Sequence, residues 1–342
     1  MNDKIGLHAP NDKITAAVAL LKAGKNVAFP TETVYGLGAD ITNPAAINRV
    51  YEIKRRPINH PLIVHFAEMN RLDYWATDVP ESARQLAEHF WPGPLTLILP
   101  RSSRVPLSVT GGQNTVGLRI PDHPIAFALL KALGPDKALA APSANRFGRL
   151  SPTSAHHVHE ELGQEVSMIL DGGTCKVGLE STIISFYDST VILLRPGGIP
   201  IASIEDILKQ KIALKKNQDI TLRAPGTLTS HYAPVTPLEV WSTESIQQRA
   251  QELSKKGAWI ALVVWSGFDH SSQASNENIH HFLMPADPIE YGQQLYATLR
   301  QLDQKGFSRL LAEAPPDDSA WLAISDRLQR ASFTTSTHNE KK

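Results

Sequence analysis

Apolar residues near the start of the chain repeat with the period of an α-helix and then give way to a short apolar run. The repeating positions are Ile14, Ala17, Val18 and Leu21. Gly24 follows them, and glycine commonly ends helices. Val27–Phe29, which comes next, is short and continuous, as expected of a buried strand. The chain is therefore predicted to begin with a helix, a turn and a strand.

The same two patterns alternate up to about residue 200. Helical periodicity predicts helices over residues 44–54, 81–90, 125–133 and 154–162. Short apolar runs predict strands over residues 62–66, 95–99, 116–120, 168–170, 182–186 and 191–194. The last two runs flank the polar residues 187–190, which predicts a β-hairpin. Hairpins mixed with helices favour an α/β domain with a mixed sheet over a purely doubly wound one.

The pattern changes after residue 200. A short helix is expected near residues 204–209, followed by a polar stretch and by the turn-rich segment 224–234. Beyond that segment, residues 259–265 and 309–311 predict strands, and residues 295–302 and 321–328 predict helices, whereas His280 and His281 are interpreted as a loop pair. The predicted organisation is a mixed-sheet domain over 10–199, a linker or lid over 200–235 and a small Rossmann-like α/β domain over 236–342.

Composition and charge narrow the class of protein. The 342 residues are 42% hydrophobic, enough for two cores, and 34 Lys+Arg balance 34 Asp+Glu. A net charge of zero argues against a surface built for nucleic acid, so any such contact is expected to be local. Cys175 is the single cysteine and can form no internal disulfide. Because no stretch resembles a signal peptide or a membrane span, we expect a soluble cytoplasmic protein.

Polar loops at the ends of the predicted strands supply the candidate chemistry. The loop over residues 30–38, P-T-E-T-V-Y-G-L-G, offers backbone N–H groups and hydroxyls to a small polar ligand, although a capped turn would use the same residues. Three cations at 54–56 end a helix before Pro57, where the helix dipole favours positive charge. A cluster of three also suits the oxygens of a triphosphate.

Arg119 stands out because it lies within an otherwise apolar predicted strand. If buried it needs a partner, which could be an internal salt bridge or the carboxylate of a ligand. Ser143, Asn145, Ser181 and Arg195 add further polar groups at strand ends, although each could simply cap a turn. Polar loops gathered at the strand ends of one domain are how open α/β sheets build ligand sites.

Several common sites are not found in the sequence. It contains no G-x-G-x-x-G after a strand, no G-x-x-x-x-G-K-[ST] phosphate loop and no G-x-S-x-G elbow. His156, His157 and His159 lack the H-E-x-x-H spacing and are interpreted as a solvated helix face. Cys175 has no activating partner nearby in the sequence. We therefore expect neither dinucleotide binding, nor a protein-held metal, nor a thiol nucleophile.

Six motifs in a fixed order carry a resemblance to a known family. They are P-T-E-T-V-Y-G-L-G, K-x-R-P-x-x-x-P-L-I-V-H, T-V-G-L-R-x-P, P-S-A-N, E-S-T-I and R-P-G. These motifs resemble the YrdC-like fold from about residue 10 to 199. With the linker motif P-G-x-x-x-x-H-Y-A-P and the extra C-terminal domain, the whole chain is similar to the long form of the threonylcarbamoyl-AMP synthase family. Phe147 departs from the resemblance, because the family often has a serine at that position.

The resemblance implies a nucleotidyl transfer. L-threonine, bicarbonate or CO2, and ATP would give L-threonylcarbamoyladenylate, pyrophosphate and water. No catalytic nucleophile is implied, because the carbamate oxygen itself attacks the α-phosphorus, and positioning with charge neutralisation can do the rest. Mg2+ would arrive with ATP, without a protein metal site or an organic cofactor. The product would pass to a tRNA threonylcarbamoyl transferase complex, with room for a weak tRNA contact and no membrane association.

The resemblance also implies the site, residue by residue. For L-threonine the implied residues are Thr33, His65, Arg119, Ala141 and Ser181. For ATP they are Lys54, Arg56, His60, Thr115, Ser143, Asn145, Ser151, Arg195 and, from the linker, Tyr232. Arg119 is the residue chosen for the carboxylate of the amino acid, because a guanidinium fork matches it.

Two other functions stay open from the sequence. An RNA-binding module could place residues 54–56 on a phosphate backbone, although the neutral charge and the lack of aromatic platforms disfavour it. A carbamoyl transferase with another acceptor would share the fold but would be expected to carry zinc-finger-like cysteine pairs, which this sequence lacks.

Overall fold

The predicted helices and strands up to residue 200 form with ends within one residue of the ranges expected from periodicity. The computed structural model describes residues 11–187, 190–214, 222–226, 231–267 and 276–332. The chain divides into two units, one of residues 1–147 and 151–227, the other of residues 148–150 and 228–342.

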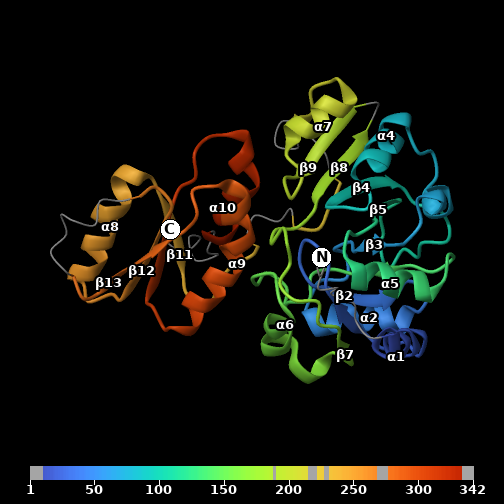
Figure 1. Cartoon of the computed structure of the whole chain (residues 1–342), viewed down its shortest axis with the longest axis horizontal. Coiled ribbons are helices and arrows are strands. Elements are labelled where there is room, and N and C mark those ends of the chain that lie inside the picture. The colour runs from blue at the N-terminus through green and yellow to red at the C-terminus, as the bar shows by residue number, and fades with distance from the viewer. Residues whose placement is uncertain (1–10, 188–189, 215–221, 227–230, 268–275, 333–342) are drawn as a thin grey trace, which may run out of the picture. The chain divides into compact units, whose positions relative to one another are not determined.

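The first unit has a mixed sheet of ten strands with helices packed on it (Figure 1). Its strands are β1 (Val27–Phe29), β2 (Gly36–Asp40), β3 (Ile63–His65), β4 (Leu95–Pro100), β5 (Thr115–Arg119), β6 (Leu139–Ala140), β7 (Met168–Ile169), β8 (Thr182–Tyr187), β9 (Thr190–Arg195) and β10 (Ala213–Leu214). Its helices are α1 (Asn11–Lys22), α2 (Pro44–Lys54), α3 (Leu72–Trp75), α4 (Glu81–Phe90), α5 (Pro124–Leu133), α6 (Ala155–Leu162) and α7 (Ile201–Leu208).

The strand order is β10-β9-β8-β4-β5-β3-β6-β2-β1-β7. Strand β3 runs parallel to β5, and β4 runs parallel to β8, whereas β4 and β5 are antiparallel. The hairpin predicted around residues 187–190 is confirmed by the antiparallel pairing of β8 with β9. The mixed-sheet prediction is therefore confirmed. The pairing places the C-terminal ends of β3 and β5 at the same edge of the sheet as the start of β8.

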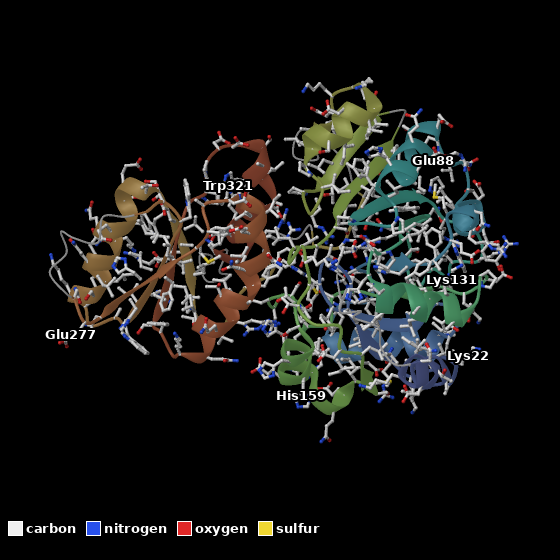
Figure 2. All side chains as sticks on the ribbon, in the orientation of Figure 1. Lys22, Glu88, Lys131, His159, Glu277 and Trp321 are labelled. Carbon is white, nitrogen blue, oxygen red and sulfur yellow. The ribbon has the colours of Figure 1, made fainter. Side chains whose placement is uncertain are left out.

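One part of the core of this unit forms where α1 and α5 pack against each other. Leu21 of α1 and Leu129 of α5 belong to one buried cluster that also contains Phe29 of β1. The charged residues Lys22 and Lys131 of the same helices are exposed (Figure 2). This apolar and polar division is the helical periodicity from which both helices could be predicted.

The sequence predicts a loop over residues 30–38, but Gly36–Asp40 form strand β2, so the loop prediction is wrong from Gly36 onward. The strand forms because it pairs antiparallel with β1, Gly38 lying opposite Val27. A Cβ atom on Gly38 would lie 2.9 Å from the ring of Phe29 and 3.2 Å from the backbone oxygen of Val27. Glycine at position 38 is therefore required by close packing rather than by a loop conformation.

The first part of the expected linker belongs to the first unit. Helix α7 packs against α4, and β10 extends the sheet by pairing with β9. Arg223 is tied to Gln113 by two hydrogen bonds, from its backbone N–H at 2.9 Å and to its backbone oxygen at 3.0 Å. Residues 215–221 and 227–230 of that linker lie outside the described residues.

The second unit has a parallel four-stranded sheet in the order β11-β14-β12-β13, as expected of a Rossmann-like domain. Its elements are β11 (Leu238–Trp241), α8 (Thr243–Lys255), β12 (Ile260–Val264), β13 (Ile279–Leu283), α9 (Pro288–Gln304), β14 (Arg309–Glu313) and α10 (Leu322–Ser332). The interpretation of His280 and His281 as a loop pair is wrong, because both lie in β13 opposite Ala261 and Leu262. No helix in the described ranges has the length and apolarity needed to cross a bilayer.

A buried carboxylate ties together the strand ends of the second unit. Glu313 closes β14 and is fully buried. Its Oε1 accepts hydrogen bonds from the hydroxyls of Thr243, at 2.7 Å, and Ser266. Its Oε2 accepts from the backbone N–H groups of Trp265 at 2.9 Å and Ser266 at 3.1 Å. The carboxylate thereby joins the ends of β12 and β14 to the start of α8.

Replacing this carboxylate should destabilise the second unit. We expect Glu313→Ala to lower the free energy of unfolding by about 2–4 kcal/mol, because several buried donors lose their acceptor. Glu290→Ala, at an exposed position of α9, is the matched control and should leave unfolding unchanged. Denaturant titrations of the two variants and the parent measure the difference. Equal stability of Glu313→Ala and the parent would contradict this assignment.

Candidate active site

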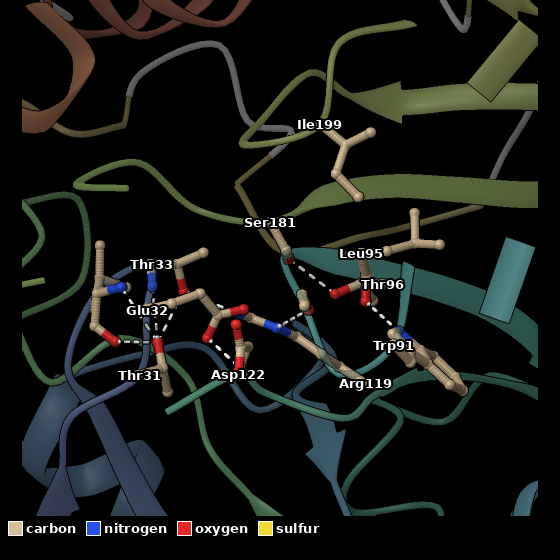
Figure 3. A network of polar contacts seen from close by, with 12 residues as sticks. Thr31, Glu32, Thr33, Trp91, Leu95, Thr96, Arg119, Asp122, Ser181 and Ile199 are labelled. Carbon is tan, nitrogen blue, oxygen red and sulfur yellow. Dashed lines mark hydrogen bonds and ion pairs between the residues drawn. The ribbon is translucent and has the colours of Figure 1, made fainter. Parts of the chain in front are cut away.

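Arg119 ends β5 with its guanidinium inside a network of polar contacts (Figure 3). Its Nη2 donates to Oε1 of Glu32 at 2.6 Å and to Oγ1 of Thr33 at 2.9 Å. Its Nε donates to the backbone oxygen of Gly93 at 3.2 Å. The side chains of Arg119 and Glu32 are both 5% exposed. Of the two partners left open for Arg119, the internal salt bridge is the one present in this structure.

Sequence reasoning did not select Glu32 as a functional residue. The one sequence feature that could have indicated Glu32 is its position beside Thr33 in the same loop. Its pairing with Arg119 depends on the fold and is not visible in the sequence. The second oxygen of Glu32 accepts the backbone N–H of Asp122 at 3.0 Å. Glu32 therefore holds both the end of β5 and the segment that follows it.

Thr31 shapes the loop that carries Thr33. Its Oγ1 accepts the backbone N–H groups of Thr33 and Val34, each at 3.2 Å, and donates to the backbone oxygen of Val34 at 2.7 Å. The hydroxyls of Thr31 and Thr33 lie 2.8 Å apart. This is the capped turn that the sequence allowed, and it fixes the Thr33 hydroxyl beside Arg119.

His65 ends β3 directly opposite Arg119 of β5. The imidazole is buried, and its Nδ1 has no hydrogen-bond partner among the described residues. Burial, with the positive charge of Arg119 as a smaller cause, lowers the pKa of His65 to about 3. His65 is therefore neutral at physiological pH and can present an unprotonated nitrogen to a ligand donor.

The depressed pKa of His65 predicts a loss of stability in acid. The ordinary value is 6.5, so below it the unfolded chain takes up a proton that the folded chain refuses until about pH 3. Stability is therefore complete above pH 6.5 and falls by about 1.4 kcal/mol per pH unit below it. Denaturant titrations between about pH 7 and pH 5 should show a smaller fall for His65→Asn than for the parent. His156→Asn, at a side chain that is 73% exposed, is the control, and a fall in His65→Asn as steep as in the parent would refute the effect.

Ser181 and Arg195 meet between β8 and β9. Arg195 donates from Nη2 to the Ser181 hydroxyl at 3.1 Å and to the Ser181 backbone oxygen at 2.8 Å. The Ser181 hydroxyl also lies 2.7 Å from that of Thr96 on β4, a residue that sequence reasoning missed (Figure 3). Ser181 is a predicted threonine ligand and Arg195 a predicted ATP ligand. Their hydrogen bonds therefore join the predicted threonine site to the predicted ATP site.

Lys54 ends α2 and organises the P-S-A-N loop. Its Nζ donates to the backbone oxygens of Ser143 and Asn145, each at 2.5 Å. The side chain is fully buried, and burial, reinforced by the charge of Arg56, lowers its pKa well below the ordinary value. Arg56 donates from Nη2 to the backbone oxygen of Pro61 at 2.8 Å. Both cations are thus held by backbone oxygens in positions fixed by the fold.

The remaining predicted residues are spread more widely. Ala141 follows β6 and donates its N–H to the backbone oxygen of Ile63, beside His65. The Ser151 hydroxyl donates to Oε1 of Glu180 at 2.5 Å. Thr115 begins β5, at the opposite end of that strand from Arg119.

Tyr232, the predicted linker contact to ATP, packs within the second unit. Its ring centroid lies 5.9 Å from that of Tyr296 and 4.8 Å from the guanidinium carbon of Arg327. Its backbone is left-handed, with φ of 60°. A contact between Tyr232 and the nucleotide stays a prediction.

The site contains no evident nucleophile or metal cage in the described part of the chain. Burial, with the charge of Glu32 as a smaller cause, raises the pKa of the Cys175 thiol to about 12, so that side chain stays protonated. No group of three or more His, Cys, Asp or Glu residues is placed to hold a metal ion among the residues described. The arrangement is one of buried cations, hydroxyls and a neutral imidazole, which suits positioning of an anionic substrate.

Comparisons with known proteins agree with the motifs. Residues 19–197 match the family described as telomere recombination, and residues 199–332 match the C-terminal domain of threonylcarbamoyl-AMP synthase. The threonylcarbamoyl-AMP synthase of Pyrococcus abyssi is 38% identical over 330 residues, covering 94% of each chain. That of Bacillus subtilis is 38% identical over 336 residues, covering 97% of this chain and 95% of the relative.

A solved structure matches the fold as well. The crystal structure of P. abyssi Sua5 complexed with L-threonine superposes with a TM-score of 0.86 at 36% sequence identity, covering 95% of both chains. The match to the C-terminal domain and both relatives carry the name threonylcarbamoyl-AMP synthase. This chain belongs to the threonylcarbamoyl-AMP synthase family.

Proposed function

We propose that this protein joins L-threonine, bicarbonate or CO2, and ATP into L-threonylcarbamoyladenylate, releasing pyrophosphate and, when bicarbonate supplies the carbon, water. The observation that carries the proposal is the match over 95% of the chain to a relative solved with L-threonine. The arrangement of buried cations and hydroxyls supports it, because this chemistry needs positioned charges and no enzyme nucleophile. The threonine nitrogen attacks the carbon of CO2 and loses a proton, or attacks the carbon of bicarbonate, from which water leaves. An oxygen of the resulting carbamate then attacks the α-phosphorus of ATP as pyrophosphate leaves.

Arg119 is suited to the carboxylate of L-threonine. Its Nε and Nη2 have protein partners, whereas its Nη1 has no hydrogen-bond partner among the described residues. A carboxylate at Nη1 would sit beside Thr33 and the unprotonated nitrogen of His65, which could accept a hydrogen from the amino or hydroxyl group. Ala141 and Ser181 would complete this side of the pocket.

The proposed ATP site combines three cations with polar groups. Lys54, Arg56 and Arg195 would neutralise phosphate charge, and Arg binds phosphate oxygens in a fork. The other proposed contacts are His60, Thr115, Ser143, Asn145, Ser151 and Tyr232. Mg2+ would arrive on the phosphate oxygens of ATP as part of the substrate.

The product is an activated carbamoyl group, so a partner must consume it. We expect that partner to be a tRNA threonylcarbamoyl transferase complex, acting in the cytoplasm. The RNA-binding alternative is weakened by burial, because Lys54 is 1% and Arg56 7% exposed. A phosphate backbone lying on the protein surface would not reach these two cations, whereas a triphosphate would have to enter the site to meet them. The sequence lacks the cysteine pairs on which the carbamoyl-transferase alternative depends.

Omission of single substrates tests the proposal. Pyrophosphate release by the full chain should require ATP, bicarbonate and L-threonine together. L-serine should be used less well, because the missing methyl group is worth about 1–3 kcal/mol of discrimination in a fitted pocket. Pyrophosphate release that continues without any amino acid would refute the proposal.

A further inference from the structure

Phe147 lies against two of the residues proposed to bind ATP. Its ring centroid is 5.3 Å from the guanidinium carbon of Arg56. The same ring meets the imidazole of His60 edge to face, with 5.2 Å between the centroids. Neither contact was expected from the sequence, where Phe147 was only a departure from the family motif.

The backbone fixes where this ring lies. The N–H of Phe147 donates to the backbone oxygen of Lys54 at 2.7 Å. In return, Nζ of Lys54 donates to the backbone oxygens of Ser143 and Asn145, each at 2.5 Å. Residues 143–147 and the end of α2 therefore hold each other through hydrogen bonds in both directions. These hydrogen bonds fix the backbone of Phe147 where its ring contacts Arg56.

We propose that Phe147 is a positioning residue for ATP, which acts by holding the guanidinium of Arg56 in the orientation that receives phosphate. The inference rests on the proposed function of the Lys54 and Arg56 site.

The chemistry of an aromatic ring suits this role. Two donors of Arg56 are occupied by backbone oxygens, Nη2 by Pro61 at 2.8 Å and Nε by His60 at 3.4 Å. The ring face attracts the guanidinium without carrying a negative charge. A carboxylate in the same place would neutralise Arg56 and repel phosphate, whereas Phe147 restrains the side chain and adds no negative charge. His60 packs against the same ring at a steep angle, 79° between the ring planes.

Direct binding of ATP to the full chain tests the inference. Phe147→Ala should raise the dissociation constant for ATP by about 3- to 30-fold, the range expected when one cation–π contact is lost. The dissociation constant for L-threonine should stay within about twofold. Phe147→Tyr keeps a π face and should retain ATP affinity, whereas Phe147→Leu fills the space without that face and should not.

The chain offers a matched control. Phe127 on α5 is 40% exposed and makes a similar contact with Lys131, whose Nζ lies 5.6 Å from the ring centroid. Phe127→Ala removes a ring of the same kind outside the site and should leave ATP binding unchanged. Thermal unfolding of every variant shows whether the fold is preserved.

The outcomes separate the inference from the proposed function. Unchanged ATP affinity in Phe147→Ala would overturn the inference, and so would full rescue by Phe147→Leu. An equal loss of ATP and L-threonine affinity would also overturn it, because a general packing defect would then explain the effect. If the parent binds ATP but releases no threonine-dependent pyrophosphate, the proposed function fails, while selective loss of ATP affinity in Phe147→Ala still supports the inference.

Discussion

Replacing Arg119 should abolish most of the threonine-dependent release of pyrophosphate. We expect Arg119→Ala to lower the rate by roughly 100- to 1,000-fold, since it removes a buried charged donor from the proposed carboxylate site. The guanidinium also holds the Thr33 hydroxyl at 2.9 Å, so the pocket loses a second contact. Arg119→Lys keeps the charge but loses the planar guanidinium that contacts Gly93, Glu32 and Thr33 together, and it should recover little activity.

The partner of Arg119 requires its own control. Arg119→Ala leaves the carboxylate of Glu32 buried without its cation, which by itself costs about 3–5 kcal/mol of stability. The double variant Glu32→Gln with Arg119→Gln removes both charges and should fold better than Arg119→Ala. It should nevertheless stay inactive, because the carboxylate ligand has no guanidinium to bind. Activity within tenfold of the parent in the folded double variant would rule out Arg119 as the carboxylate ligand.

Replacing Lys54 should have the second largest effect, on the ATP side. Lys54→Met keeps the apolar stem and removes the ammonium, so the backbone oxygens of Ser143 and Asn145 lose their donor. The phosphates lose a cation at the same time. We expect ATP-dependent turnover to fall roughly 100-fold, with a smaller change in threonine affinity.

Arg55 is the matched control for Lys54, because it is the adjacent cation and is exposed. Arg55→Ala should keep turnover near that of the parent. A site that uses buried positioned charges predicts this contrast between Lys54 and Arg55. If Arg55→Ala impaired turnover as much as Lys54→Met, a diffuse surface charge would explain ATP binding better.

Periodicity predicted most of the elements because burial and chain geometry act locally. The apolar stripe of α1 and the run of β1 could be recognised from neighbouring residues alone. Strand β2 could not, because G-L-G-A-D has little strand propensity and forms through its pairing with β1. His280 and His281 were misassigned for the same reason, since β13 is held by its neighbour β12.

The chemistry of the site was only partly visible in the sequence. The motifs indicated which residue types meet, and Arg119 was recognised as an ion that needs a partner. That the partner is Glu32, 87 positions away, depends on the fold, which brings the loop between β1 and β2 to the end of β5. The hydrogen bonds of Lys54 to residues 143–147 likewise join a side chain to backbone oxygens. Every residue has a backbone oxygen, so the sequence does not show which of them Lys54 contacts.

Product analysis with labelled bicarbonate tests the central claim most directly. The full chain would be incubated with ATP, Mg2+, L-threonine and 13C-bicarbonate, and the products would be separated and identified by mass spectrometry. The account predicts an adenylate that contains threonine and the 13C label, formed in equal amount to pyrophosphate. Pyrophosphate without a labelled adenylate, or an adenylate of threonine that lacks the label, would contradict it.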